Sequence, residues 1–382
     1  MSISNHKKIM IIAGARPNFM KVAPLMRAFQ SYPYSNPILV HTGQHYDDNM
    51  SRLFFEELQI PKPEINLGVG SASHAQQTAA IMTGIEPVML SCKPDVVVVV
   101  GDVNSTVGCG LVAVKLGIRL AHVEAGLRSH DRSMPEEINR ILTDAMSDLL
   151  FCSEPSGIEN LQRENVESKK VHLVGNVMID SLLYCRKQAA KSLVLERHGL
   201  EQKGYGILTL HRPSNVDDNR VFSRIVEALE EIQRDMPIVF PVHPRTRACI
   251  QETYLGDRIK AMSQIMMVDP FGYMDFMKLM SSAYVVLTDS GGIQEETTIL
   301  GIPCLTLREN TERPATVDMG TNQIVGTDAQ RIVAAFKAIK RRNKLPETMP
   351  PLWDGHAAER IADIIIEDSS VAKQNYSLMR SA

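Results

Sequence analysis

Three carboxylates stand where the sequence predicts a strand end or a helix start, namely Asp102, Glu124 and Glu136. Asp102 follows the apolar run 95–101 (DVVVVVG), and Glu124 ends the predicted strand 119–124. Glu136 follows a proline in the first turn of a predicted helix. Neighbouring carboxylates can push their pKa values apart, which separates an acid from a base. The three residues are therefore candidates for proton transfer.

Each carboxylate also has a structural interpretation. Asp102 could cap the following helix, although Asn104 is equally suited to that position. Glu124 could form a structural ion pair with Arg128 or Arg140. Consecutive glutamates at a helix start also complement the helix dipole, which would account for one of the two in MPEEINR. The residue types alone leave both interpretations open.

Other predicted strands are followed by groups that could bind an anion. The segment 14–21 (GARPNFMK) places two cations beside a helix start, and 288–296 (TDSGGIQEE) places glycine amides there. A histidine–arginine pair in 210–215 (LHRPSN) could bind a phosphate or transfer a proton. For each segment the alternative is an ordinary surface turn. The resulting candidates are Arg16, Lys21, His211, Ser290, Gly291, Gly292, Glu296 for ribose hydroxyls, and Arg313 as a further cation.

Short β-branched runs alternate with longer amphipathic stretches, a pattern typical of βαβ units with parallel sheets. The pattern restarts after about residue 200, and 382 residues exceed what one hydrophobic core usually supports. We therefore predict an α/β protein with two Rossmann-like domains, 1–185 and 200–350, whose sheets face a central cleft. The segment 351–382 is predicted to be a C-terminal helix and tail that could cross back to the first domain.

Composition excludes several classes of function. The net charge of -3 argues against nucleic-acid binding. No apolar run reaches the ~18–20 residues that span a bilayer, and the N-terminus does not resemble a signal peptide. The six cysteines are scattered and indicate a reducing, cytoplasmic location. Neither cysteine nor histidine spacing suggests a metal site, and neither GxGxxG nor GxSxG occurs.

Taken in order, the motifs GARPNFMK, TGQH, GDVNST, HVEAGLRS, MPEEINR, VHPRT and DSGGIQEE with ERP resemble those of the non-hydrolysing UDP-N-acetylglucosamine 2-epimerases. That family has the glycosyltransferase-B fold, and the resemblance covers nearly the whole chain. It implies that the catalytic residues are Asp102, Glu124, Glu136 and His211. It further implies that the substrate is bound by Arg16, Lys21, Arg140, Phe276 near the uracil, Ser290, Gly291, Gly292, Glu296 and Arg313.

The resemblance also implies a reaction. Family members interconvert UDP-N-acetylglucosamine and UDP-N-acetylmannosamine by eliminating UDP to a 2-acetamidoglucal and adding it back, without a cofactor or metal. A homodimer acting in cytoplasmic polysaccharide synthesis is the usual context, with a UDP-sugar as the only other partner. The alternatives are an epimerase or hydrolysing epimerase for a related UDP-2-acetamido sugar, a glycosyltransferase of the same fold, and a protein that only binds nucleotide sugars.

Overall fold

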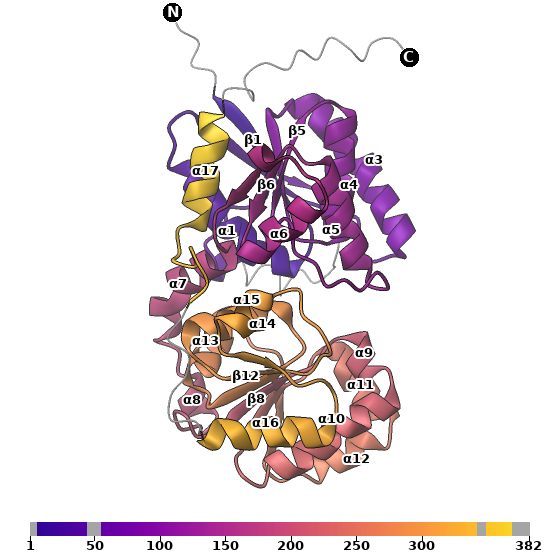
Figure 1. The fold of residues 1–382 in the computed structure, drawn as a ribbon, viewed down its shortest axis with the longest axis vertical. Helices are drawn as coiled ribbons and strands as arrows, with labels where there is room; N and C mark the ends of the chain where they lie inside the picture. The colour runs from indigo at the N-terminus through magenta and orange to yellow at the C-terminus, as the bar shows by residue number, and fades with distance from the viewer. Residues whose placement is uncertain (1–5, 44–54, 342–348, 369–382) are drawn as a thin grey trace, which may run out of the picture. The chain divides into compact units, whose positions relative to one another are not determined.

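The chain folds into two compact units, each built around one parallel sheet (Figure 1). The computed structural model describes residues 6–43, 55–341 and 349–368. Unit 1 comprises Met1–Tyr184 and Pro351–Ala382, and unit 2 comprises Cys185–Pro350. The chain passes from the first unit to the second within α7 (Val177–Ala189). The end of the TGQH motif lies outside the described residues.

The described strands of unit 1 form a seven-stranded sheet in the order β3-β2-β1-β4-β5-β6-β7. Every strand pairs in parallel with its neighbours. All five valines of β4 are buried, because helices cover both faces of this sheet. The strands are β1 (Lys7–Ala13), β2 (Ser35–His41), β3 (Ile65–Asn66), β4 (Val96–Val100), β5 (Arg119–Val123), β6 (Leu149–Cys152) and β7 (Val171–Leu173).

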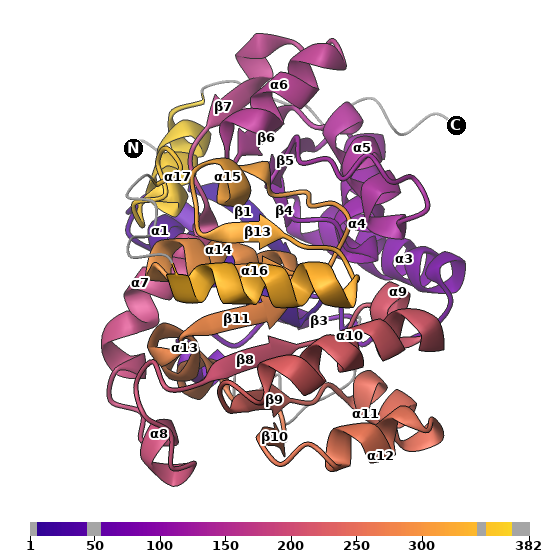
Figure 2. The same ribbon diagram turned by 60° about the horizontal axis from the view of Figure 1, so that its bottom comes forward.

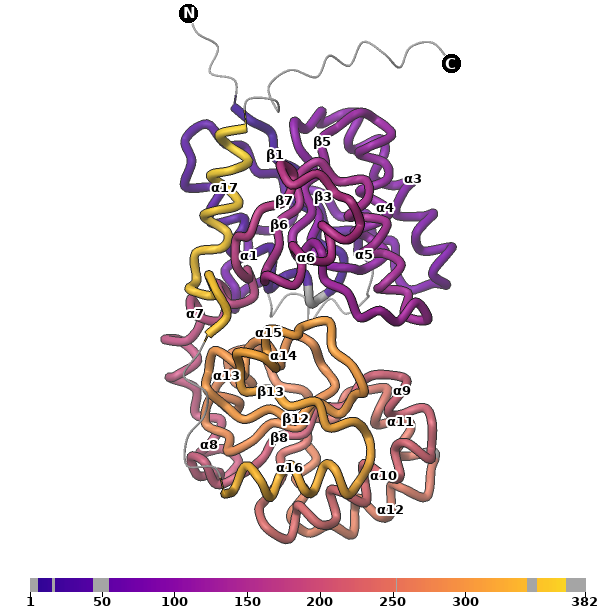
Figure 3. The backbone as a smooth tube through the Cα atoms, viewed as in Figure 1, coloured from indigo at the N-terminus to yellow at the C-terminus, as the bar shows by residue number. Residues whose placement is uncertain are grey.

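Alternate residues of these strands pack against helices on opposite faces. Met10, Val97 and Val99 pack against α3 and α4 through Ile81 and Val112. The C-terminal helix α17 lies beside α1 in unit 1, although the two helices come from opposite ends of the chain (Figure 3). The helices are α1 (Arg16–Gln30), α3 (His74–Cys92), α4 (Asn104–Lys115), α5 (Pro135–Met146), α6 (Pro155–Arg163), the 3-10 turn η1 (Ser168–Lys170) and α17 (Ala357–Glu367).

The described strands of unit 2 form a six-stranded parallel sheet in the order β10-β9-β8-β11-β12-β13. They are β8 (Gly206–Thr209), β9 (Ile238–Pro241), β10 (Ile265–Val268), β11 (Val285–Thr288), β12 (Cys304–Thr306) and β13 (Asn322–Ile324). Leu208, Phe240 and Leu287 join one core cluster, whereas Ile207 and Val286 join another. Adjacent strand residues point to opposite faces, so the sheet is buried on both sides.

Helices α10 and α16 lie side by side over one of these clusters (Figure 2). Helices α8 and α13 contribute to the other. The helices of unit 2 are α8 (Val194–Arg197), α9 (Pro213–Val216), α10 (Asn219–Ile232), α11 (Pro244–Glu252), α12 (Leu255–Lys260), α13 (Tyr273–Ser282), α14 (Gly291–Leu300), α15 (Pro314–Asp318) and α16 (Ala329–Arg341). The predicted α/β class with two parallel sheets is confirmed.

The strand order of each unit reverses once. The reversal lies between β1 and β4 in unit 1, and between β8 and β11 in unit 2. In open α/β sheets, ligands bind outside the carboxyl ends of the strands at such a switch point. These two points locate the candidate sites.

Candidate functional site

Two acidic residues follow neighbouring strands of unit 1. The register pairs Val100 of β4 with Val123 of β5, so Asp102 and Glu124 come from adjacent loops. Glu124 is 3% exposed and adopts a φ of 70°, a left-handed conformation that is costly for a residue with a side chain. Strain of this kind is concentrated at functional sites. The tertiary structure therefore holds Glu124 in a conformation that its sequence does not favour.

Glu124 is held by a cation from a different part of the chain. Lys21, on α1, lies with Nζ 2.6 Å from Oε2 of Glu124, and its side chain is 10% exposed. Gly101 has a φ of 66°, and a Cβ at that position would lie 2.9 Å from Nζ of Lys21. The glycine is thus required by its backbone conformation and by the space that the ammonium group occupies.

The turn after β1 is connected to β4 by Asn18. Its Oδ1 accepts hydrogen bonds from the amides of Gly14 and Ala15 at 3.0 and 2.9 Å. Its Nδ2 donates to the carbonyl of Val100 at 3.3 Å. Arg16 begins helix α1, but its side chain is outside the described part of the structure. The switch point of unit 1 is therefore a fixed turn beside a helix N-terminus.

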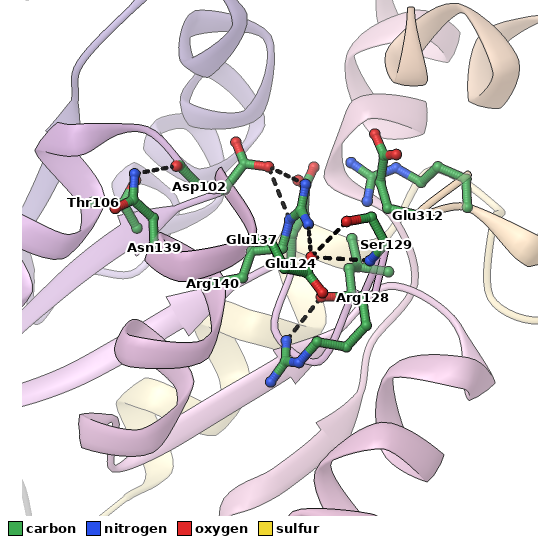
Figure 4. Close-up of polar contacts among 12 residues, drawn as sticks. Asp102, Thr106, Glu124, Arg128, Ser129, Glu137, Asn139, Arg140 and Glu312 are labelled. Atoms are coloured by element: carbon green, nitrogen blue, oxygen red, sulfur yellow. Dashed lines mark hydrogen bonds and ion pairs between the residues drawn. The ribbon is translucent and has the colours of Figure 1, made fainter. Parts of the chain in front are cut away.

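Asp102 is held by two residues of α5 (Figure 4). Nε and one terminal nitrogen of Arg140 each lie 3.0 Å from its Oδ2. Asn139 donates from Nδ2 to the backbone carbonyl of Asp102 at 2.9 Å. Helix α4 begins with Val103 at its N-cap, and that residue makes no side-chain cap bond.

The two consecutive glutamates of α5 differ in environment. Glu136 is exposed in the first turn of the helix. Glu137 is 1% exposed and forms an ion pair with Arg140. Glu137 was not among the residues predicted for the site, because two adjacent glutamates give no sign of which one faces inward. The structure thus brings Lys21 to Glu124 and Arg140 to Asp102, and it places Glu136 on the surface of unit 1.

A buried network of charged side chains contacts the loop that carries Asp102. His122 is fully buried; its Nδ1 lies 2.6 Å from Oδ1 of Asp144, and its Nε2 lies 2.8 Å from the carbonyl of Gly101. Arg128 lies 2.7 Å from Oδ2 of Asp144 and also pairs with Glu164. Burial opposes ionisation of Asp144, but His122 and Arg128 outweigh it and lower its pKa. Arg128 therefore pairs with Asp144 and Glu164. His122 fixes the backbone carbonyl of Gly101, the residue directly before Asp102.

At the switch point of unit 2, His211 pairs with Asp289. Its Nδ1 lies 2.8 Å from Oδ1 of Asp289, which is fully buried, whereas the histidine side chain is 43% exposed. Asp289 also accepts hydrogen bonds from the amides of His211 and Arg212 at 3.0 and 2.9 Å. Burial disfavours its charge, yet these hydrogen bonds lower its pKa. Sequence reasoning missed Asp289, although it stands directly before the predicted Ser290.

Helix α14 begins at the predicted glycine pair, with Ser290 at the N-cap. The Ser290 amide donates to Oγ1 of Thr288 at 3.0 Å, so it is already used. A Cβ on Gly291 would lie 2.7 Å from Oε1 of Glu312, which shows how closely this buried carboxylate approaches the helix start. Arg308 binds Glu312 at 2.8 Å. Burial opposes the charge of Glu312, but the surrounding arginines hold its pKa well below the usual range.

The remaining predicted residues of unit 2 have defined surroundings. Glu296 is 4% exposed and accepts a hydrogen bond from the Tyr273 hydroxyl at 3.0 Å, and burial raises its pKa to about 7. Nε of Arg313 lies 2.6 Å from Oε1 of Glu295. Phe276 is half-buried and packs against an apolar cluster of unit 2. Gly292 lies in the first turn of α14.

Neither a metal site nor a membrane span is found in the part of the chain that the structure describes. The acidic, histidine and cysteine side chains there do not gather in groups of three or more that could hold a metal ion. None of the described helices is long and apolar enough to cross a bilayer.

Two doubly wound units with acids and cations at their switch points define an enzyme of the glycosyltransferase-B fold class. A family model described as UDP-N-acetylglucosamine 2-epimerase matches residues 27–366. The chain therefore belongs to this epimerase family, and the enzyme is an isomerase of the non-hydrolysing type. The resemblance stated from the sequence motifs is confirmed.

Individual relatives agree with this classification. A Methanocaldococcus jannaschii protein named UDP-N-acetylglucosamine 2-epimerase is 43% identical over 369 residues, covering 94% of this chain and 98% of its own. A solved structure of the enzyme from that organism, in complex with UDP-GlcNAc and UDP, has a TM-score of 0.88 at 44% identity and covers 94% and 99% of the two chains. A Pseudomonas aeruginosa protein named UDP-2,3-diacetamido-2,3-dideoxy-D-glucuronate 2-epimerase is 42% identical, with 94% and 99% covered.

Proposed function

We propose that this protein interconverts UDP-N-acetylglucosamine and UDP-N-acetylmannosamine by inverting C2. The observation that carries the proposal is that two candidate acids of unit 1, Asp102 and Glu124, each pair with a buried cation. Glu124 is bound by Lys21 and Asp102 by Arg140, at the ends of adjacent strands. Relatives at 40–43% identity bear the corresponding name, which supports the substrate assignment.

The chemistry explains why acids rather than a cofactor are needed. The C2 proton of the sugar is not adjacent to a carbonyl group, so direct deprotonation is very difficult. Breaking the bond between C1 and the phosphate oxygen first builds positive charge on the ring, which nearby carboxylates stabilise. One carboxylate then accepts the C2 proton, which gives 2-acetamidoglucal and UDP. Delivery of a proton to the other face of C2 and return of UDP to C1 complete the epimerisation.

In this proposal unit 1 acts on the sugar. Asp102, Glu124 and Glu136 are the candidate acids and bases, of which Glu136 is exposed on α5. Lys21 and Arg140 fix the first two carboxylates and contribute positive charge near the departing diphosphate.

Unit 2 binds UDP. The first turn of α14 offers the amides of Gly291 and Gly292 and the positive end of the helix dipole. Glu296 is suited to the ribose hydroxyls because it is buried and already bonded to a hydroxyl group. His211 is suited to the diphosphate or to proton transfer because Asp289 orients its ring. The remaining candidates in unit 2 are Arg313 for phosphate, Phe276 for uracil and Ser290 for the diphosphate. Arg16, also a candidate for phosphate, belongs to unit 1.

A second candidate substrate is a related UDP-2-acetamido sugar. It is favoured by the 42% identity to the Pseudomonas aeruginosa relative, which nearly equals the identity to the relatives named for UDP-N-acetylglucosamine. Both sugars share the 2-acetamido group and the C2 centre, so the same acids would serve either.

The test is to incubate purified protein with UDP-N-acetylglucosamine alone in deuterated water. The proposal requires a manno product that carries deuterium at C2, without acceptor or metal. Free N-acetylmannosamine with UDP would indicate hydrolysis instead. Unchanged sugar, together with turnover of the UDP-2,3-diacetamido uronate, would establish the second candidate.

The proposal also includes a homodimer acting in the cytoplasm on precursors of surface polysaccharides. This assignment is supported only by the family resemblance of the motifs. Light scattering after size-exclusion chromatography tests the dimer, because a dimer would have twice the 42.5 kDa mass of the chain.

A further inference from the structure

The buried glutamate of α5 lies between a loop and an arginine of the candidate site. Glu137 is 1% exposed. Its Oε2 accepts hydrogen bonds from the amide and the hydroxyl of Ser129 at 2.9 and 3.0 Å. Its Oε1 accepts one from the amide of His130 at 2.9 Å, a residue with a φ of 59°. Each carboxylate oxygen is therefore used by a fixed donor.

The same carboxylate also fixes Arg140. The guanidinium of Arg140 uses one terminal nitrogen for Oε2 of Glu137, and Nε and the other terminal nitrogen for Oδ2 of Asp102. The arginine is 3% exposed, so its charge is shared between two carboxylates rather than with water. Figure 4 shows Arg140 between Asp102 and Glu137, with Ser129 beside the latter.

We propose that Glu137 is a positioning residue for the epimerisation, acting through Arg140 on Asp102. The inference rests on the proposed function, in which Asp102 reacts at the sugar. A guanidinium is a planar fork with fixed donor directions, so a second carboxylate that binds one side of it determines where the other side points. Without Glu137, Arg140 retains its charge but loses the contact that fixes its plane.

The consequence is a change in turnover rather than in nucleotide binding. A displacement of about 1 Å in a reacting group can reduce the rate about 100-fold. UDP binding is assigned mainly to residues of unit 2, to which Glu137 does not belong. Loss of Glu137 should therefore lower kcat and leave the KM and the Kd for UDP nearly unchanged.

The experiment compares Glu137→Gln, Arg140→Lys and the double variant in the C2 deuterium assay. Calorimetry with UDP is the binding readout. We expect kcat to fall about 100-fold in Glu137→Gln, with KM and Kd changed less than about 3-fold. Because both residues act on the same carboxylate, the double variant should be no more than about 3-fold slower than Arg140→Lys. Fully multiplicative losses would mean that Glu137 acts independently of Arg140 and would overturn the proposal.

Glu164→Gln is the matched control, because it also removes a carboxylate that pairs with an arginine of unit 1. Its kcat should stay within about 3-fold of the wild-type value, and an equal loss there would overturn the proposal. If Glu137→Gln does not fold, the kcat of Arg140→Lys is the deciding measurement. The compact ammonium group of lysine cannot replace a guanidinium that binds two carboxylates at once. Wild-type kcat in Arg140→Lys would refute the inference. A wild-type protein that turns over neither candidate sugar would refute the proposed function itself, and the inference with it.

Discussion

Asp289→Asn is expected to leave the His211 ring without a fixed orientation and to destabilise the fold. The carboxylate binds the His211 ring at 2.8 Å and accepts hydrogen bonds from the backbone amides of His211 and Arg212. It also lies 3.3 Å from Nδ2 of Asn215. An asparagine keeps the shape but presents an NH₂ group to at least one of these donors.

The expected loss of stability follows from the number of donors left without an acceptor. A hydrogen bond to a charged group contributes about 1.5–3 kcal/mol, and leaving a buried donor unpaired costs about 1–3 kcal/mol. Asp289 is fully buried, but the His211 side chain is 43% exposed, so water can replace part of the lost interaction on the histidine side. We therefore expect the free energy of unfolding to fall by about 1–3 kcal/mol and kcat to fall at least ~100-fold, the lower range for losing general acid–base catalysis.

Urea unfolding and the deuterium assay measure these effects. Asp217→Asn is a matched control, since that aspartate pairs with Arg245 in unit 2 but is 43% exposed. It should change stability by less than about 1 kcal/mol. The pKa of Asp289 lies below its usual value, so its stabilisation is present above about pH 4 and is lost as pH falls through the folded-state pKa. Wild-type stability and kcat in Asp289→Asn would refute the argument.

Three further predictions follow from individual contacts. Gly291→Ala should raise the Kd for UDP by at least about 10-fold in calorimetry, because the new Cβ would lie 2.7 Å from Oε1 of Glu312; an unchanged Kd would contradict this reading of the helix start. In urea titrations, the free energy of unfolding of Asp180→Asn should rise by about 2–3 kcal/mol relative to that of the wild type as the pH is raised from 4 to 6. Burial raises the pKa of Asp180 to about 6, so the stability that its protonated form gives the wild type is lost as the pH rises through that value. Parallel pH profiles of the two proteins would contradict this prediction. Asp102→Asn and Glu124→Gln should each lose most turnover in the deuterium assay while UDP binding persists, and the reverse pattern would exclude their assignment.

Much of the fold could be predicted from local patterns. The five consecutive valines of β4 are typical of a central parallel strand, and the structure buries all of them. Residues at predicted strand ends, such as Asp102 and Glu124, lie at the carboxyl ends of adjacent strands. Each strand is located by its apolar run, and the polar residue that follows the run marks the strand end, so this part of the site is encoded by the hydrophobic pattern.

Partners from distant segments could not be predicted in the same way. Lys21 was expected to bind substrate, and the structure pairs it with Glu124 over a separation of 103 residues. Asp144 lies in a helical segment without any distinguishing motif, yet it binds His122 and Arg128. Sequence spacing carries no information about which charged side chains meet when helices pack on a sheet.

The sequence by itself determined the class of fold, the family and the types of residue available for chemistry, because hydrophobic periodicity and ordered motifs are local properties. Only the tertiary structure decided that Glu137 faces inward while Glu136 is exposed, and that Asp289 orients His211. The physical reason is that burial and pairing of charges depend on the packing of elements far apart in the chain, where desolvation makes every unpaired charge costly.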